Sequence, residues 1–196
     1  MTVHVSAPPA SGPARPGRPR APRAGRLERG SSPHEGERLR PLTRGQVEDR
    51  LRELGDLYAE CRGGGSRAWN EARTGFLRHL AADARRPGFS LLIAESTTLT
   101  GFAYGFPAGR HFVVSGIVVP PRVRHAYQDR SWNLARRLSR RLLGDHGSVL
   151  GVTLVDARDD ETVEVLRAWG WRSAGDGTLP ELAPGPYRVL VLPPDA

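Results

Sequence analysis

Three strand-like runs that lie close together in the middle of the chain constrain its fold more than any other feature. FSLLIAE (89–95), LTGFAYGF (99–106) and HFVVSGIVV (111–119) are rich in β-branched and aromatic residues. The first two flank the polar turn STT and therefore predict an antiparallel hairpin. Pro120-Pro121 ends the third run, because proline has no N–H to donate to a sheet ladder.

Two amphipathic helical patterns precede these runs. Thr43 and Gln46 have the spacing of a capping box in front of an apolar series that continues to Cys61, and RGGGS then ends this helix. A second helix is expected over 71–85, before Pro87. The residues expected to face inward are Val47, Leu51, Leu54, Leu57, Tyr58 and Cys61 in the first helix and Phe76, Leu77, Leu80 and Ala84 in the second.

Helices alternate with strands in the second half of the chain. An Arg-rich loop follows Pro121, and the remaining expected elements are a helix over 132–143, a buried strand over 149–156, a helix from Asp159 or Asp160 to Trp169, and strands in WRSA and YRVLVLP. With a short strand in RLRPL ended by Pro41, the order is β-α-α-β-β-β-α-β-α-β-β. We expect an α/β (α+β) fold with a mixed central sheet flanked by helices.

Residues 1–36 differ in composition from the rest of the chain. Six arginines stand among prolines and glycines, with almost no large apolar residue, which predicts a disordered Arg/Pro/Gly-rich tail ahead of a domain over 37–196. The net charge is +8, and half of this excess lies in the tail. All 29 basic residues are arginine. The pattern favours a solvated charge excess over a nucleic-acid surface.

Two absences limit the class of protein. No apolar run is long enough for a membrane span, so no membrane partner is expected. Cys61 is the single cysteine, which excludes a disulfide within the chain, and the histidines have no metal-ligand spacing, so no metal site is expected. We therefore expect a soluble, cytoplasmic protein.

Several segments resemble a known family. The strand end Ile117-Val118-Val119-Pro120-Pro121, the helix end Leu166-Arg167-Ala168-Trp169-Gly170-Trp171, and the segments 68–71 and 101–105 are similar to the GNAT (GCN5-related N-acetyltransferase) superfamily. The order of elements is similar too, and the resemblance extends from about Arg38 to Pro193. It implies transfer of an acetyl group from acetyl-CoA to a primary amine of an unknown acceptor by direct attack, in a monomer or a homodimer.

The resemblance also implies a cofactor site. The backbones of Ile117 and Val119 would hold the pantetheine arm, and the following loop and helix N-terminus would hold the pyrophosphate. The other residues implied at this site are Arg124, Gln128, Arg130, Ser131, Trp132, Asn133 and Ala135.

The pyrophosphate loop departs from the family pattern. If its motif begins at Arg124, Tyr127 and Asp129 occupy the glycine positions. If it begins at Gln128, those positions are Ser131 and Asn133. We prefer the second register because Ser131 is also a natural N-cap for the following helix.

A second departure concerns catalysis. Leu166 stands where many family members carry a tyrosine acid, and it cannot protonate a departing thiolate. The candidate bases are Glu71, Tyr104 and His125, with His111 as a further candidate. These departures leave open a catalytically degenerate GNAT-fold module acting in binding or regulation, and, as a weaker alternative, an Arg-rich nucleic-acid binder.

Overall fold

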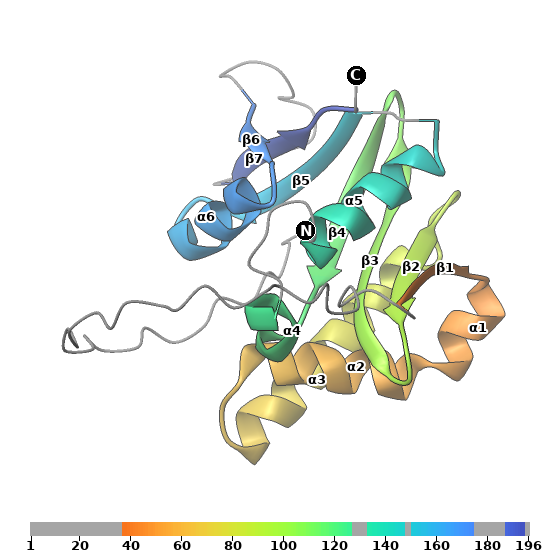
Figure 1. Cartoon of the computed structure of the whole chain (residues 1–196), viewed down its shortest axis with the longest axis vertical. Helices are drawn as coiled ribbons and strands as arrows, with labels where there is room; N and C mark the ends of the chain where they lie inside the picture. The colour runs from red at the N-terminus through yellow and green to blue at the C-terminus, as the bar shows by residue number, and fades with distance from the viewer. Residues whose placement is uncertain (1–36, 127–132, 148–149, 175–186, 195–196) are drawn as a thin grey trace, which may run out of the picture.

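The computed structural model of this chain describes residues 37–126, 133–147, 150–174 and 187–194 (Figure 1). The predicted tail, 1–36, lies outside these residues. The elements are β1 (Arg38–Leu42), α1 (Arg44–Asp49), α2 (Leu51–Arg62), α3 (Ser66–Asp83), β2 (Ser90–Glu95), β3 (Leu99–Ala108), β4 (His111–Val118), α4 (Pro121–Ala126), α5 (Leu134–Gly144), β5 (Leu150–Asp156), α6 (Asp160–Ala168), β6 (Arg172–Ser173) and β7 (Tyr187–Leu192).

The described strands form one seven-stranded sheet in the order β1-β2-β3-β4-β5-β7-β6. The predicted hairpin is confirmed, since β2 pairs with β3 in an antiparallel register from Ser90↔Gly105 to Glu95↔Leu99. Among the described strands, β4 and β5 are the parallel pair, and the other neighbours are antiparallel. The predicted mixed sheet is therefore confirmed. Pro41 does not end β1, which continues to Leu42 because β1 is an edge strand and tolerates proline.

Helices cover both faces of the sheet and bury two apolar cores (Figure 1). Side chains of α5 and α6 pack on one face, and side chains of α1, α2 and α3 pack on the other. Strand β3 supplies both cores: Ala103 belongs to the α5–α6 core, while Phe102 and Tyr104 belong to the α1–α3 core. This division follows from the alternation of side chains along a strand. No helix in the described part of the chain has the length and apolar character to cross a membrane.

The first predicted helix is broken into two. The capping box of Thr43 and Gln46 is confirmed at the start of α1, but the helix is interrupted at Arg50, whose φ and ψ are −105° and 9°. The Arg50 guanidinium donates to Glu95 on β2 at 2.8 Å. This contact between distant residues is invisible to local periodicity. In addition, α3 begins at Ser66, earlier than the predicted start at Glu71.

The Glu95 carboxylate makes stability depend on pH. Burial raises the pKa of Glu95, but hydrogen bonds from Arg50 and from Arg40, which lies 3.1 Å away, outweigh burial and lower the pKa below its ordinary value. A carboxyl whose pKa is lower in the folded state stabilises the fold above its unfolded pKa. This stabilisation is lost as the pH falls through the folded pKa.

We therefore expect Glu95→Gln to reduce the acid sensitivity of the protein. At neutral pH the substitution should lower the free energy of unfolding by about 1 kcal/mol, and this difference should vanish as the pH falls toward the folded-state pKa of Glu95. Urea unfolding at a series of pH values measures this difference in the free energy of unfolding between the variant and the wild type. Glu48→Gln on α1 is the matched control, since Glu48 is exposed and has no ion pair within the described residues. A pH-independent difference would contradict the prediction.

Candidate active site

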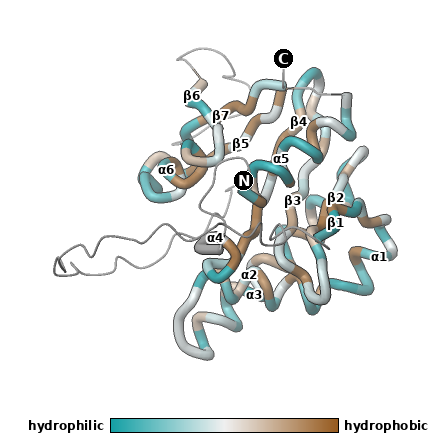
Figure 2. The backbone as a smooth tube through the Cα atoms, viewed as in Figure 1, coloured by the Kyte–Doolittle hydropathy of each residue, from teal (hydrophilic) through white to brown (hydrophobic). Residues whose placement is uncertain are grey.

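Strands β4 and β5 run together and then separate. Their parallel ladder joins His111–Val113 to Leu150–Val152, whereas β4 continues to pair with β3 as far as Val118. Figure 1 shows the two strands side by side at one end and apart toward α4, and Figure 2 shows this part of β4 as strongly hydrophobic. One edge of β4 beyond Val113 is thus left without a strand partner among the described residues.

A β-bulge lies where the strands separate. Tyr104 on β3 is opposite Gly116, whereas its neighbour Gly105 is opposite Val114, so Ser115 is an extra residue on β4. A bulge bends its strand and increases the local twist, which explains why β4 leaves β5 here. The packing is tight, because a Cβ atom added to Gly116 would lie 2.3 Å from Cε1 of Tyr104.

The orientation of the peptide groups along β4 follows from two contacts. The Val114 carbonyl faces β5, since it accepts a hydrogen bond from Oγ1 of Thr153 at 2.9 Å. The Val118 carbonyl faces β3, since it would lie 3.0 Å from a Cβ atom added to Gly101. Because successive residues of a strand alternate, the N–H and C=O of Ile117 point toward the gap between β4 and β5. We call this gap, bounded by Val114–Val118 of β4 and by the half of β5 that follows Val152, Thr153–Asp156, the split.

The segment after β4 differs from the prediction. Where an Arg-rich loop was expected, Pro121 begins the short helix α4, which is a favourable position for proline because the first helical N–H is not needed. The N-cap of α5 is Asn133, whose Oδ1 accepts from the Arg136 N–H at 3.2 Å. The prediction of Ser131 as the N-cap is therefore wrong. An asparagine cap closer to the apolar face Leu134–Leu138 satisfies the helix end instead.

Positive charge lies beside the first turn of α5, which carries no acidic residue. A Cβ atom added to Gly170 would lie 3.9 Å from Nε of Arg136, so the Arg136 side chain extends toward the end of α6. Burial lowers the pKa of Arg140, and the nearby Arg136 lowers it further. In contrast, Nε of Arg122 on α4 donates to the Glu60 carboxylate on α2 at 2.7 Å. This bond raises the pKa of Arg122, and the negative charge of Glu60 offsets the positive charge of the guanidinium.

Solved structures with a similar fold include acetyltransferases. In sequence, the chain matches no protein-family model and no curated protein. A GNAT-family protein of Desulfovibrio desulfuricans superposes with a TM-score of 0.55 at 13% identity, covering 80% of this chain and 98% of that chain. The chain has the GNAT fold.

Two further solved structures agree with this assignment of the fold. An acetyltransferase of Streptococcus agalactiae gives a TM-score of 0.52 at 13% identity, covering 81% of this chain and 99% of that chain. The PaiA N-acetyltransferase of Thermoplasma acidophilum, in complex with coenzyme A, gives a TM-score of 0.50 at 10% identity. The match covers 80% of this chain and 98% of that chain.

The GNAT fold places the predicted cofactor-binding residues around the split only in part. Ile117 and Val119 lie at and just beyond the end of β4, and their side chains are buried. Asn133 and Ala135 lie at the start of α5, with Ala135 also buried. Arg124 lies on α4, but its side chain is outside the described part of the structure. Outside the described residues altogether are Gln128, Arg130, Ser131 and Trp132.

The three candidate bases whose side chains the structure describes, Glu71, Tyr104 and His111, lie in different places. Glu71 is exposed on α3 and forms an ion pair with Arg67 at 2.9 Å. Tyr104 is buried against aromatic rings including Phe76, and burial raises its pKa well above the ordinary value, with further contributions from Asp83 and Tyr58. His111 lies at the paired end of β4, away from the split.

The remaining positions concern proton donors. His125 lies on α4, and its side chain is outside the described part. Leu166, at the position of the missing tyrosine acid, is fully buried in the α5–α6 core.

Sequence reasoning overlooked Ser115 and Thr153 beside the split. Their signal was a lone hydroxyl residue inside each of two otherwise apolar runs, HFVVSGIVV and VLGVTLVD.

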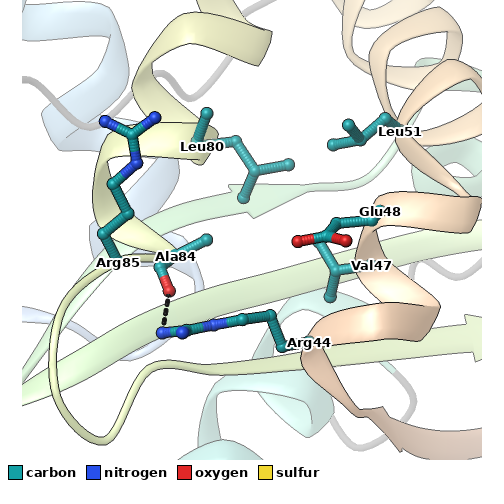
Figure 3. A pocket seen from close by; sticks show the side chains of 8 residues that line it. Arg44, Val47, Glu48, Leu51, Leu80, Ala84 and Arg85 are labelled. Carbon is teal, nitrogen blue, oxygen red and sulfur yellow. Dashed lines mark hydrogen bonds between the residues drawn. The ribbon is translucent and has the colours of Figure 1, made fainter.

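A separate pocket of about 290 Å³ lies between α1 and the end of α3. Figure 3 shows Val47, Leu51 and Leu80 around it, with Arg44 donating to the Ala84 carbonyl. None of the predicted site residues lines this pocket. The candidate active site therefore remains the split.

Proposed function

We propose that residues 37–196 form an N-acyltransferase domain that moves the acetyl group of acetyl-CoA to a primary amine. The observation that carries the proposal is the unpaired edge of β4 at Ile117, whose N–H and C=O face the split. A pantetheine arm carries two amides and can pair with such an edge as an additional strand. The GNAT fold and its coenzyme A-bound relative support the same assignment.

The pyrophosphate would lie toward α5. The first turn of this helix presents the positive end of the helix dipole, and it carries no acidic side chain to repel an anion. Arg136 adds a positive charge on the same turn. With the pyrophosphate there and the arm along Ile117, the thioester would reach the narrow end of the split.

In the proposed reaction the nitrogen of a neutral amine attacks the thioester carbon. A C–N bond forms, the C–S bond breaks, and the CoA thiolate leaves. The nitrogen loses one proton, and the thiolate takes up one proton from water, because Leu166 cannot supply it. A catalytically degenerate binding module is the second candidate, since the loop lacks glycine and Leu166 replaces an acid.

Calorimetric titration of the full chain with acetyl-CoA tests the proposed site. We expect micromolar binding, and we expect Ile117→Pro to weaken it by about tenfold because this substitution removes the N–H that faces the split. Arg38→Pro is the control, since it places proline at the first residue of the edge strand β1. Circular dichroism verifies that both variants fold.

Release of the free CoA thiol in the presence of primary amines then separates the two candidates. Release that depends on an added amine supports the transferase. Binding without release from any amine would favour the degenerate module, and no binding at millimolar acetyl-CoA would refute the cofactor site.

A further inference from the structure

Ser115 carries a buried hydroxyl group within strand β4. Its residue is 6% exposed, and within the described residues no group bonds to its Oγ atom. The other buried serine and threonine residues of the described part are satisfied: Ser139 donates to the Ala135 carbonyl at 2.8 Å, Thr153 to the Val114 carbonyl, and Thr162 to Asp159. An unsatisfied buried hydroxyl destabilises a protein, so its presence suggests a partner outside the chain.

The position of Ser115 identifies where that partner would lie. Ser115 is the extra residue of the bulge, two residues beyond Val113, the last residue of β4 paired with β5. Ile117 lies two residues farther along, toward α4 and α5. An arm that enters from the α5 end and pairs with Ile117 would therefore bring its deepest atoms to Ser115.

We propose that Oγ of Ser115 donates a hydrogen bond to the thioester carbonyl oxygen of bound acetyl-CoA, an inference that rests on the proposed function. When an amine attacks the carbonyl carbon, an electron pair moves onto this oxygen. The hydroxyl stabilises that negative charge and keeps its own proton throughout. As the C–S bond breaks, the electron pair re-forms the C=O bond and the thiolate departs.

The surrounding sequence makes a packing role for this hydroxyl unfavourable. Val114 and Ile117 on the same strand are buried and apolar, so alanine at position 115 would fit the core without an unsatisfied polar atom. A hydroxyl with a purely structural role would also bond within the fold, as Oγ of Ser139 does.

The test compares acetyl-CoA with CoA, because CoA lacks the thioester carbonyl group but keeps the pantetheine arm and the pyrophosphate. We expect Ser115→Ala to weaken acetyl-CoA binding by roughly 3- to 10-fold and to leave CoA binding unchanged, as measured by calorimetry on the full chain. The urea midpoint should not fall. Ser139→Ala removes a fully buried hydroxyl on α5 and serves as the control, with both affinities unchanged.

The outcomes separate the two proposals. If the wild-type chain binds acetyl-CoA and Ser115→Ala binds both ligands as the wild type does, the role of Ser115 is refuted while the proposed function stands. An equal loss for both ligands, or a marked drop in the urea midpoint, would assign Ser115 a structural role and would also overturn the inference. If the wild-type chain binds neither ligand, both proposals fail.

Discussion

Gly105→Ala is expected to lower the free energy of unfolding by about 3 kcal/mol, because β3 and β4 approach too closely at the bulge to admit a methyl group. A Cβ atom on Gly105 would lie 2.0 Å from the Val113 carbonyl oxygen and 2.7 Å from Cε1 of Phe112. The first contact is with backbone, so a change of side-chain rotamer cannot relieve it. The strands would have to move apart at the point where the split begins.

Urea unfolding measures this loss, and Gly75→Ala supplies the matched control. Gly75 lies inside α3, and a Cβ atom there would meet nothing within 4 Å. Alanine should stabilise that helix by up to about 1 kcal/mol, because glycine has the greater backbone entropy to lose. Equal urea midpoints for Gly105→Ala and the wild type would show that the bulge accommodates a side chain.

Glu37→Ala is expected to destabilise the fold by about 3 kcal/mol, because the substitution removes the buried carboxylate that pairs with the half-buried guanidinium of Arg137. The Glu37 side chain is 3% exposed and accepts from Arg137 on α5 and from Oγ1 of Thr100 on β3, each at 2.8 Å. It thus holds the start of β1, β3 and α5 together. Glu37→Gln should lower the free energy of unfolding by less than Glu37→Ala, since an amide oxygen can still accept one of these hydrogen bonds.

The control for Glu37 is Glu164→Ala, which breaks the exposed ion pair with Arg167 on α6. Exposed pairs contribute little, so a change of less than about 1 kcal/mol is expected. Thermal or urea unfolding distinguishes the two sites.

A chain starting at Glu37 should keep the stability of the full chain, whereas one starting at Arg40 should lose the Glu37 contribution. Similar midpoints for Glu37→Ala and Glu164→Ala would argue against this buried network.

Several features that depend on near neighbours in the chain agree with the prediction. Thr43 caps α1 through Gln46, and Asp159, one of the two residues expected to begin α6, caps that helix through Thr162. The β2–β3 hairpin belongs to the same group, since its strands are joined by a short turn. Caps and short turns involve residues a few positions apart, so their chemistry can be read directly from the sequence.

The features that the sequence did not predict involve contacts between residues far apart in the chain. Arg50, where the helix is interrupted, donates to Glu95, 45 residues away, and Arg137 on α5 donates to Glu37, 100 residues away. The split arises because β4 bulges at Ser115 against β3 and so departs from β5.

The sequence by itself therefore predicted the strands, most of the helices and the resemblance to the GNAT fold, but neither the helix break at Arg50 nor α4. Only the tertiary structure decided which edge of β4 lacks a strand partner among the described residues, and that the buried Ser115 hydroxyl forms no hydrogen bond within them. The physical reason is that periodicity specifies which face of an element is apolar, whereas register, bulges and strand separation depend on how distant segments pack.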